Sequence, residues 1–244
     1  FSGVLNYESL PSAMLRNNGN GTFTDVTKET GLAEPSPGIA AIGSDVNNDR
    51  AVDLVVTGYI SPATVFQNPR EGKFHATFPA QGGPTPEFGV AVLDFDHDGW
   101  MDLAFTHFWG GTSGLSLWRN NHGKSFDQVK LPETSWVRAY GVAAFDYDND
   151  GWVDLVAVGE TKEGRGEIKL FRNLGPDGFK DVTADVGLDK IQLKDPRAIV
   201  TGDYDGDGAT DLLITQNHGP AVLLRNEGGN KNHWLRLSLK GLGD

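Results

Sequence analysis

Residues 146–154 read Asp-Tyr-Asp-Asn-Asp-Gly-Trp-Val-Asp, and similar acidic segments occur three more times in the chain. The other copies occupy residues 45–53, 94–102 and 203–211, so successive copies begin 49, 52 and 57 residues apart. A short apolar segment follows each copy at once, as in Leu155-Val-Ala-Val158. Self-similarity at a period of about 50 residues indicates a repeat architecture.

A second recurring signal lies between the acidic segments. It is an apolar pair that precedes an asparagine, usually as Arg-Asn, and the asparagines are Asn17, Asn68, Asn120, Asn173 and Asn226. In four copies a phenylalanine follows six residues after the asparagine, whereas in the fifth the nearest aromatic residue is Trp234, eight residues on. Each unit therefore contains four short apolar segments separated by turn residues.

These segments predict an all-β fold, a β-propeller of four-stranded blades with about five blades visible. The 32 glycines and 12 prolines suit many tight connections, and no apolar stripe of helical period appears. A linear solenoid is the alternative architecture. Residues 1–31 resemble a blade without its first strand and acidic loop. We expect propeller repeats over residues 1–231, while residues 232–244 form either a last strand or the start of another domain.

Composition excludes several classes of partner. The 21 Lys and Arg against 33 Asp and Glu give a net charge of −12, so the chain has no general means of neutralising nucleic-acid phosphates. No run approaches the roughly 18 apolar residues that a membrane-spanning helix needs, so we expect no membrane insertion. The chain has no cysteine, which excludes disulfides and thiolate metal sites.

The acidic segments predict calcium sites. Acids at positions one, three, five and nine of a curled loop, with Gly at six and a carbonyl at seven, offer the oxygen-only cage that Ca²⁺ prefers. An EF-hand is excluded because position twelve is apolar in every copy. We expect three to four ions. The predicted ligands are Asp45, Asn47, Asp49, Ala51, Asp53, Asp94, Asp96, Asp98, Trp100, Asp102, Asp146, Asp148, Asp150, Trp152, Asp154, Asp203, Asp205, Asp207, Ala209 and Asp211, with the position-seven residues acting through their carbonyls.

The first copy departs from this pattern. Asn47 removes one negative charge at position three, and Arg50 stands where the other copies have glycine. A non-glycine residue with positive φ is strained, and the arginine adds a charge that repels a cation. We therefore expect the first site to be the weakest, and whether it binds an ion at all is open.

The sequence also offers aromatic and histidine residues at the face opposite the acidic loops. Candidate ligand-binding residues there are Tyr59, His107, Trp109 and Trp136. Exposed aromatic rings can stack on sugars or anchor a protein partner. The alternative is that most of these side chains pack between the blades.

The chain resembles a known repeat family. The acidic loops, the Arg-Asn-x-Gly turns and the Phe-x-Asp-Val-Thr segments at 23–27 and 179–183 resemble the FG-GAP/VCBS repeats of integrin α-subunit heads and many bacterial secreted proteins. The aromatic-Gly pair of the repeat stands at residues 88–89 and 140–141. The resemblance implies calcium at the matching loop positions and, as in integrins, a seven-bladed ring of which these units would be part. A closed five-bladed ring is also open.

Residues 233–241 resemble the start of the ASPIC/UnbV domain that follows such repeats in the cartilage acidic protein-like group. We interpret the chain as a secreted, non-catalytic calcium-binding module for interaction or adhesion, extracellular or periplasmic. Its partner would be a protein or glycan on the face opposite the calcium loops. A lectin-like propeller and an accessory domain of a polysaccharide-degrading enzyme are the alternatives. The sequence carries no Gly-x-Ser-x-Gly, phosphate-binding or zinc-protease motif.

Overall fold

The computed structural model describes residues 12–33, 38–59, 62–77, 86–108, 114–235 and 237–238. Within these ranges every paired strand is antiparallel to its neighbour, and strands follow sequence order in each sheet. Blade 1 holds β3 (Gly38–Ser44), β4 (Asp53–Gly58), β5 (Thr64–Gln67) and β6 (His75–Thr77); blade 2 holds β7 (Glu87–Leu93), β8 (Asp102–His107), β9 (Leu115–Asn120) and β10 (Phe126–Val129).

The remaining elements belong to two further blades and a hairpin. Blade 3 holds β11 (Trp136–Phe145), β12 (Asp154–Thr161), β13 (Gly166–Asn173) and β14 (Phe179–Asp181); blade 4 holds β15 (Pro196–Gly202), β16 (Asp211–Gln216) and β17 (Val222–Leu224). The hairpin pairs β1 (Leu15–Asn17) with β2 (Phe23–Asp25) and leads into α1 (Thr27–Thr30). Short 3₁₀ turns are η1 (Gly175–Asp177), η2 (Leu188–Lys190) and η3 (Gly229–Lys231).

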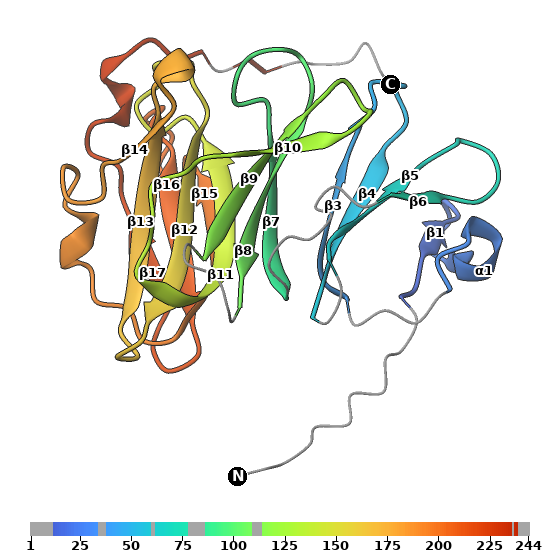
Figure 1. Ribbon diagram of the computed structural model, residues 1–244, viewed down its shortest axis with the longest axis horizontal. Coiled ribbons are helices and arrows are strands. Elements are labelled where there is room, and N and C mark those ends of the chain that lie inside the picture. The colour runs from blue at the N-terminus through green and yellow to red at the C-terminus, as the bar shows by residue number, and fades with distance from the viewer. Residues whose placement is uncertain are drawn as a thin grey trace.

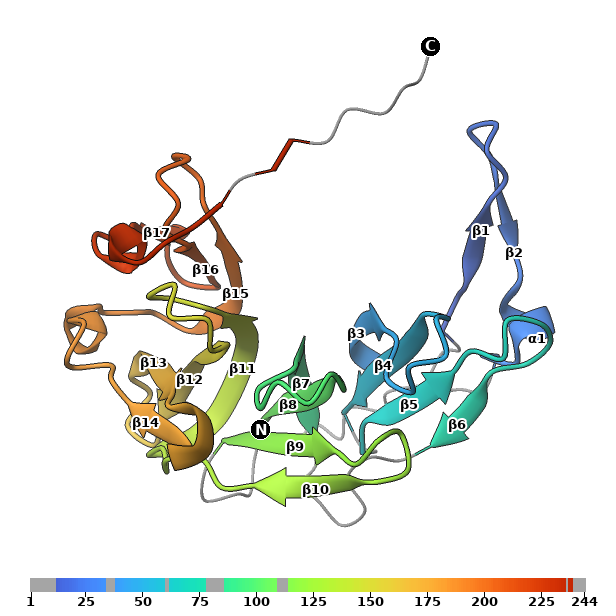
Figure 2. The same cartoon turned by 90° about the horizontal axis from the view of Figure 1, so that it is seen from above.

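The blades follow one another along an arc, as in a propeller. Figure 2 shows the four sheets side by side with their first strands, β3, β7, β11 and β15, toward the inside of the arc. Figure 1 shows the arc from the side, where strands such as β3, β7 and β13 run along the height of the molecule. The all-β propeller arrangement predicted from the repeats is confirmed.

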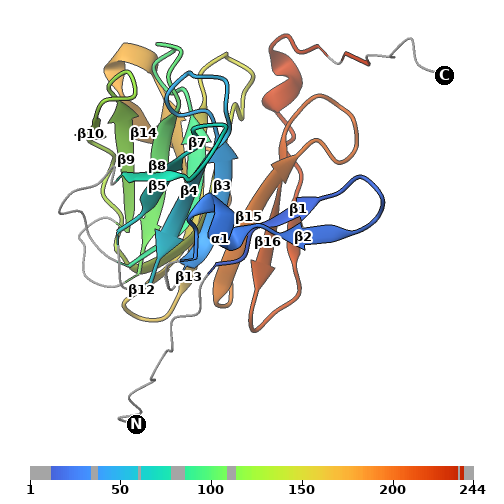
Figure 3. The ribbon, with the colours of Figure 1, turned by 90° about the vertical axis from the view of Figure 1, so that its right-hand side faces the viewer.

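The expected number of blades was wrong: the described residues form four blades, not five. The unit at residues 1–31 carries only the Arg-Asn half of the repeat, so it gives the hairpin β1–β2, which projects away from blade 1 (Figures 2 and 3). Blade 4 has three strands in the described part of the chain. Its sequence lacks the phenylalanine that begins or directly precedes the fourth strand in the other blades, and η3 forms after β17 instead.

The apolar core lies between neighbouring blades. Because successive strand residues point to opposite faces, Leu155 and Ala157 of β12 pack toward blade 2 while Val156 and Val158 pack toward blade 4, all without measurable exposure. The interface of blades 1 and 2 repeats this pattern. Burying each such side chain contributes about 1.5–3 kcal/mol, so blade-to-blade packing accounts for most of the apolar stabilisation.

The aromatic-Gly pairs let adjacent blades approach closely. A Cβ on Gly89 would lie 2.3 Å from the carbonyl oxygen of Tyr140 in the next blade, so only glycine fits there. Threonines on the second strands tie the same contact: Thr57 Oγ1 donates to the carbonyl of Phe88 at 2.8 Å, and Thr106 Oγ1 donates to that of Tyr140. The inner strands are therefore held together by polar bonds as well as by packing.

Candidate metal centre

Each acidic segment joins the first and second strands of one blade. We call residues 45–53 loop 1, residues 94–102 loop 2, residues 146–154 loop 3 and residues 203–211 loop 4, and we number their positions one to nine. Position nine is already the first residue of the second strand. The four loops therefore occupy equivalent places along the arc.

The curl of each loop is made by its own carboxylates. In all four loops the aspartate at position one accepts from the backbone N–H of position five through Oδ1, at 3.0–3.1 Å. Its Oδ2 accepts from position six at 2.7–3.2 Å. The aspartate at position five accepts from position seven at 2.7–2.9 Å. Such side-chain bonds to nearby N–H groups fix a tight turn locally.

The aspartate at position nine is the buried anchor of each loop. Its Oδ1 accepts from the backbone N–H of the repeat asparagine at 2.7 Å in every blade. Its Oδ2 accepts from the N–H of position two at 2.9–3.2 Å. Burial, and to a smaller extent the neighbouring carboxylates, raise the pKa of both Asp102 and Asp154 to about 7. A cation beside these groups would stabilise their charged form.

Three loops bring carboxylates together around one point. Three groups of the described residues each bring one carboxylate oxygen per residue within 4.8 Å of the others. They are Asp94, Asp96 and Asp102; Asp146, Asp148 and Asp154; and Asp203, Asp205 and Asp211. These are positions one, three and nine of loops 2, 3 and 4. Each triad can hold a metal ion. Loop 1 forms no such triad of acids in the described residues, since Asn47 stands at position three.

The triads fit a hard cation. The buried Oδ1 atoms of Asp96 and Asp148 accept no hydrogen bond, although they lie among other carboxylates. A buried acceptor without a partner is destabilising, and a bound cation supplies the missing interaction. The triads offer only oxygen atoms, which suits Ca²⁺ or Mg²⁺ and not Zn²⁺.

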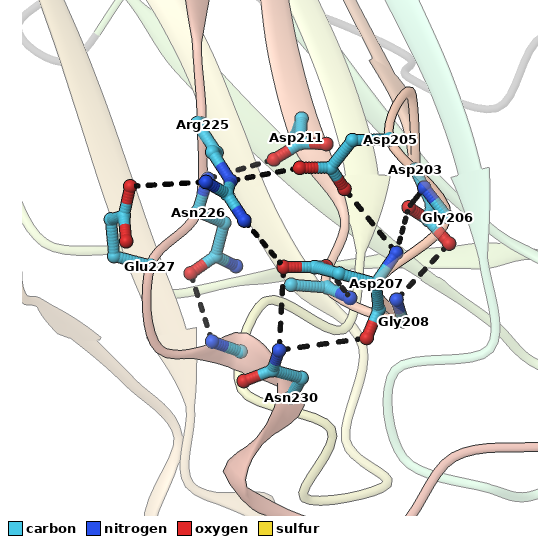
Figure 4. A network of polar contacts seen from close by, with 12 residues as sticks. Asp203, Asp205, Gly206, Asp207, Gly208, Asp211, Arg225, Asn226, Glu227 and Asn230 are labelled. Carbon is cyan, nitrogen blue, oxygen red and sulfur yellow. Dashed lines mark hydrogen bonds and ion pairs between the residues drawn. The ribbon is translucent and has the colours of Figure 1, made fainter.

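In blades 2, 3 and 4 the arginine of the Arg-Asn pair lies against the outer side of its own loop. Arg119 Nε lies 2.6 Å from Asp96 Oδ2, and Arg172 Nη2 lies 2.8 Å from Asp148 Oδ2. Figure 4 shows the same arrangement in blade 4, where Arg225 contacts the carboxylates at positions three and five. The arginine thus neutralises outward oxygens and leaves the other oxygen of position three for the triad. The repeat of this residue was visible in the sequence, but its role was not.

Position five is not part of the triads. The carboxylates of Asp98, Asp150 and Asp207 use one oxygen for the N–H of position seven and the other for the arginine. Their predicted role as ligands, and that of the carbonyls at position seven, remain predictions.

In blades 2, 3 and 4 the asparagine of the Arg-Asn pair clamps its blade to the loop before it. The Nδ2 group of Asn120 donates to the carbonyl of Val46 at 2.7 Å, and that of Asn173 donates to Phe95 at 2.8 Å. Asn226 makes the same bond to loop 3 at 2.7 Å. Each acceptor is the position-two carbonyl of the preceding acidic loop. The only sequence signal for this clamp is the regular spacing of the asparagines.

Neighbouring loops also contact one another directly through position four. Asn48 Nδ2 donates to the carbonyl of Gly99 at 3.0 Å, and Asn149 Nδ2 donates to that of Gly208 at 3.0 Å. Between loops 2 and 3 the His97 ring stacks on Trp152, with ring centroids 4.3 Å apart and planes 6° from parallel. The candidate metal sites therefore form one connected row along an edge of the arc.

Loop 1 keeps the hydrogen-bonded curl, the buried anchor and the contacts to blade 2, but it lacks the acid triad, the glycine at position six and the outer arginine. Arg50 adopts φ of 68°, in the left-handed region that the other loops fill with glycine, so the expected strained conformation is present. Gln67 replaces the arginine that faces the other loops. Arg70, from the β5–β6 turn, donates instead to the backbone carbonyl of Asp49.

The residues proposed for the opposite face have different environments. Trp136 and His107 are each only 2% exposed; the indole of Trp136 donates to Glu167, and a ring nitrogen of His107 lies 2.8 Å from Ser116 Oγ. Both are packed inside the structure, as the packing alternative expects. Tyr59 is half-buried. Trp109 lies outside the described residues.

An aromatic row runs beside Tyr59, and it includes the aromatic residues of both aromatic-Gly pairs. Phe88 lies against Tyr59, Phe108 and Tyr140, with ring centroids 4.8–6.2 Å apart. The guanidinium of Arg197 lies 4.0 Å from the ring centre of Tyr140. This row combines apolar faces with a cation, which is the chemistry that sugars and peptides recognise.

Comparison with known proteins identifies the family. A profile of the family described as FG-GAP-like repeat matches residues 45–105 and 146–214, which together make up more than half of the chain. The chain belongs to this family. The first matched segment contains loops 1 and 2, and the second contains loops 3 and 4. The FG-GAP repeat therefore coincides with the acidic loops.

Curated relatives share the name cartilage acidic protein 1. The chain is 27% identical to the mouse protein over 227 residues and 26% identical to the human protein, covering 87% of this chain in each case. It is 28% identical to the Xenopus tropicalis protein over 230 residues. The chain spans about a third of the length of these relatives. The similarity agrees with the resemblance to the cartilage acidic protein-like group.

Among solved structures, the Vibrio cholerae biofilm matrix protein Bap1 matches with a TM-score of 0.39 and 14% identity, covering 76% of this chain and 36% of that one. In the described ranges, no helix has the length and apolar character needed to cross a membrane.

Proposed function

We propose that this chain is a secreted, non-catalytic interaction module whose FG-GAP blades are stabilised by calcium bound in loops 2, 3 and 4. The observation that carries the proposal is the geometry of the triads. Each brings three carboxylates within 4.8 Å, and buried oxygens of Asp96 and Asp148 accept no hydrogen bond. Without a cation these groups repel one another in a partly desolvated loop.

Calcium is favoured over magnesium by the ligand set. A curled loop that offers three carboxylates and nearby carbonyls can supply the six to eight oxygens that Ca²⁺ takes, whereas Mg²⁺ keeps several waters and uses one or two carboxylates. The ion's role is structural. It fixes a loop whose position-two carbonyl is clamped by the next blade, so metal binding in one blade is linked to packing of two.

The non-catalytic, extracellular assignment rests on similarity. FG-GAP-like repeats match more than half of the chain, and its curated relatives are named for cartilage, an extracellular tissue. Extracellular calcium near millimolar concentration is enough for modules that bind it with Kd of about 10⁻⁴–10⁻³ M. The proposed activity is therefore recognition of a partner by a scaffold that is folded only in calcium-rich surroundings.

The test is a calcium titration of metal-depleted protein by calorimetry, paired with thermal unfolding in calcium, in magnesium and in chelator. We expect three calcium ions per chain and a melting temperature that rises with calcium more than with magnesium. Asp148→Asn should remove one ion. Asp127→Asn, which changes an exposed carboxylate of β10 outside the triads, serves as the matched control. Absence of binding up to millimolar calcium would refute the proposal.

A second candidate function, glycan recognition, is favoured by the aromatic row at Tyr59, Phe88, Phe108 and Tyr140. Arg138 and Arg197 lie over the rings of Phe108 and Tyr140, so the row would suit a sugar that carries acidic groups. A glycan array compares the chain with its Phe108→Ala variant. Equal signals for the two proteins would remove this candidate.

A further inference from the structure

The buried anchors of neighbouring acidic loops are joined by a continuous run of hydrogen bonds. Between loops 2 and 3 the run starts at Asp102, whose Oδ2 accepts from the backbone N–H of Phe95 at 3.1 Å. The carbonyl of Phe95 accepts from Nδ2 of Asn173 at 2.8 Å, and the backbone N–H of Asn173 donates to Asp154 Oδ1 at 2.7 Å. A carboxylate of one triad is therefore linked by hydrogen bonds to a carboxylate of the next.

The run continues beyond loop 3. Asp154 accepts through its other oxygen, Oδ2, from the N–H of Tyr147 at 2.9 Å. The carbonyl of Tyr147 accepts from Asn226 Nδ2 at 2.7 Å, and the N–H of Asn226 donates to Asp211 at 2.7 Å. Asn120 joins loop 1 to loop 2 in the same way. Each anchor between two clamps thus uses one oxygen toward the preceding blade and the other toward the following blade.

The members of the run around loops 2 and 3 are shielded from water. The side chains of Asp102, Asp154 and Asn173 are each 0% exposed. A hydrogen bond in such surroundings is stronger than the same bond in water, and a group that loses its partner there cannot turn to solvent instead. Fixing the position of one member therefore restricts the positions of the others.

Loops 2 and 3 also meet at their outer ends. There the ring of His97 stacks on Trp152. These residues occupy positions four and seven, which hold no triad carboxylate, whereas Asn173 bonds directly to the triad residue Asp154. The asparagine clamp is therefore the shorter connection between the two triads.

We propose that calcium binding in loop 2 and calcium binding in loop 3 favour each other, and that Asn173 carries the coupling. The inference rests on the calcium binding proposed above. An ion that fixes Asp154 also fixes Asn173, and through it the carbonyl of Phe95 and the curl of loop 2. The second ion then meets a loop that is already ordered. Because the coupling is a free energy shared by two sites, it is the same in both directions.

The test is a calcium titration that resolves the two sites by NMR. Gly99 and Gly151 serve as reporters, because their N–H groups donate to the position-one aspartates of loops 2 and 3 at 3.0 and 2.8 Å. Asp148→Asn disables loop 3, and half-saturation of loop 2 should then need at least about fivefold more calcium. Asp96→Asn disables loop 2 and should weaken binding in loop 3 by the same factor. Circular dichroism shows that each variant is folded.

The route of the coupling is tested with Asn173→Ala, which keeps the backbone N–H that Asp154 accepts but removes the clamp. In this background Asp148→Asn should change calcium binding in loop 2 by less than about twofold. A purely electrostatic effect of the lost carboxylate would survive there. Asn68→Ala is the matched control, since it removes the equivalent side chain of blade 1, which donates to Val52 within its own blade. The fivefold factor should persist in that control.

Hydrogen exchange in chelator adds a readout without metal. Asn173→Ala should speed exchange of the Phe95 N–H, which lies in loop 2, whereas Asn68→Ala should not; unchanged exchange would contradict the proposal. Calcium sites that fill independently overturn the coupling and leave the proposed function intact. Coupling that persists in Asn173→Ala overturns the route and assigns it to the stack of His97 on Trp152. If neither loop binds calcium, the proposed function and this inference fail together.

Discussion

Loop 1 and loop 3 share a backbone curl but differ in what the curl encloses. In both, the aspartates at positions one, five and nine accept the same set of backbone N–H groups. Only loop 3 adds a third carboxylate within 4.8 Å, a glycine at position six and an arginine on the outer side. The difference shows that the loop's shape comes from side-chain hydrogen bonds, whereas the candidate metal site depends on one further acid.

The largest expected effect comes from removing the buried anchor of loop 3. Asp154→Ala leaves the N–H groups of Tyr147 and Asn173 without acceptors and removes a triad carboxylate. We expect roughly 2–6 kcal/mol less stability by urea unfolding, at about 1–3 kcal/mol per unsatisfied group. Asp53→Ala makes the same loss in loop 1. If calcium does not widen the gap between the two variants, the distinction between the loops fails.

Removal of an asparagine clamp between blades should cause the second-largest loss of stability. Asn173→Ala removes bonds to the carbonyls of Phe95 and Val153, and the side chain is fully buried, so we expect a loss of about 2–4 kcal/mol. Asn68→Ala removes only a half-exposed bond within blade 1 and should cost less than about 1 kcal/mol. Chemical unfolding of both variants measures the difference, and equal losses would contradict the clamp's role between blades.

Glu87 is a buried acid away from the acidic loops, so the pH dependence of stability that it causes can be separated from effects of the triads. Burial raises the pKa of Glu87 from 4.5 to about 7, and no metal triad lies beside it. Because the folded state holds this proton more tightly than the unfolded state, stability should fall as pH rises from about 4.5 to 7, by about 1–3 kcal/mol in total. Glu87→Gln should remove this slope at any calcium concentration. A slope that persists in the variant would assign the effect to other groups.

The smallest expected change in stability is a gain in loop 1. Arg50→Gly relieves a positive φ of 68° and should stabilise the chain by about 1 kcal/mol. Combined with Asn47→Asp, it gives loop 1 the acids and glycine of loop 3. Calorimetry should then count one more calcium ion than in the unmodified chain. An unchanged ion count would mean that the arginine of the Arg-Asn pair, replaced here by Gln67, is also required.

The sequence predicted what is encoded locally. The positions of Asp146, Asp148 and Asp154 within nine residues determine the triad. Short runs of apolar residues, such as the one that contains Leu155 and Val156, determine the strands. The anomaly of loop 1 was also readable, since a non-glycine residue at a positive φ is identifiable from its repeat position.

Contacts between repeat units could not be predicted from the sequence. The bond from Asn173 to Phe95 spans 78 residues, so only the folded arc reveals that the asparagine serves the preceding blade. The number of blades depended on whether partial units complete a sheet, and the unit at residues 1–31 gives only a hairpin. The burial of Trp136 also depends on a contact between units, since its side chain packs in the apolar cluster between blades 2 and 3.

The asparagine clamp gives the molecule a polarity. Every clamp runs from one blade back to the loop of the blade before it. Unfolding of one blade therefore frees the loop of the preceding blade, whereas the loop of the following blade stays clamped by the blade after it. In a nearest-neighbour array this makes cooperativity directional. Loss of order would therefore travel from an unfolded blade toward the amino-terminal end, one acidic loop at a time.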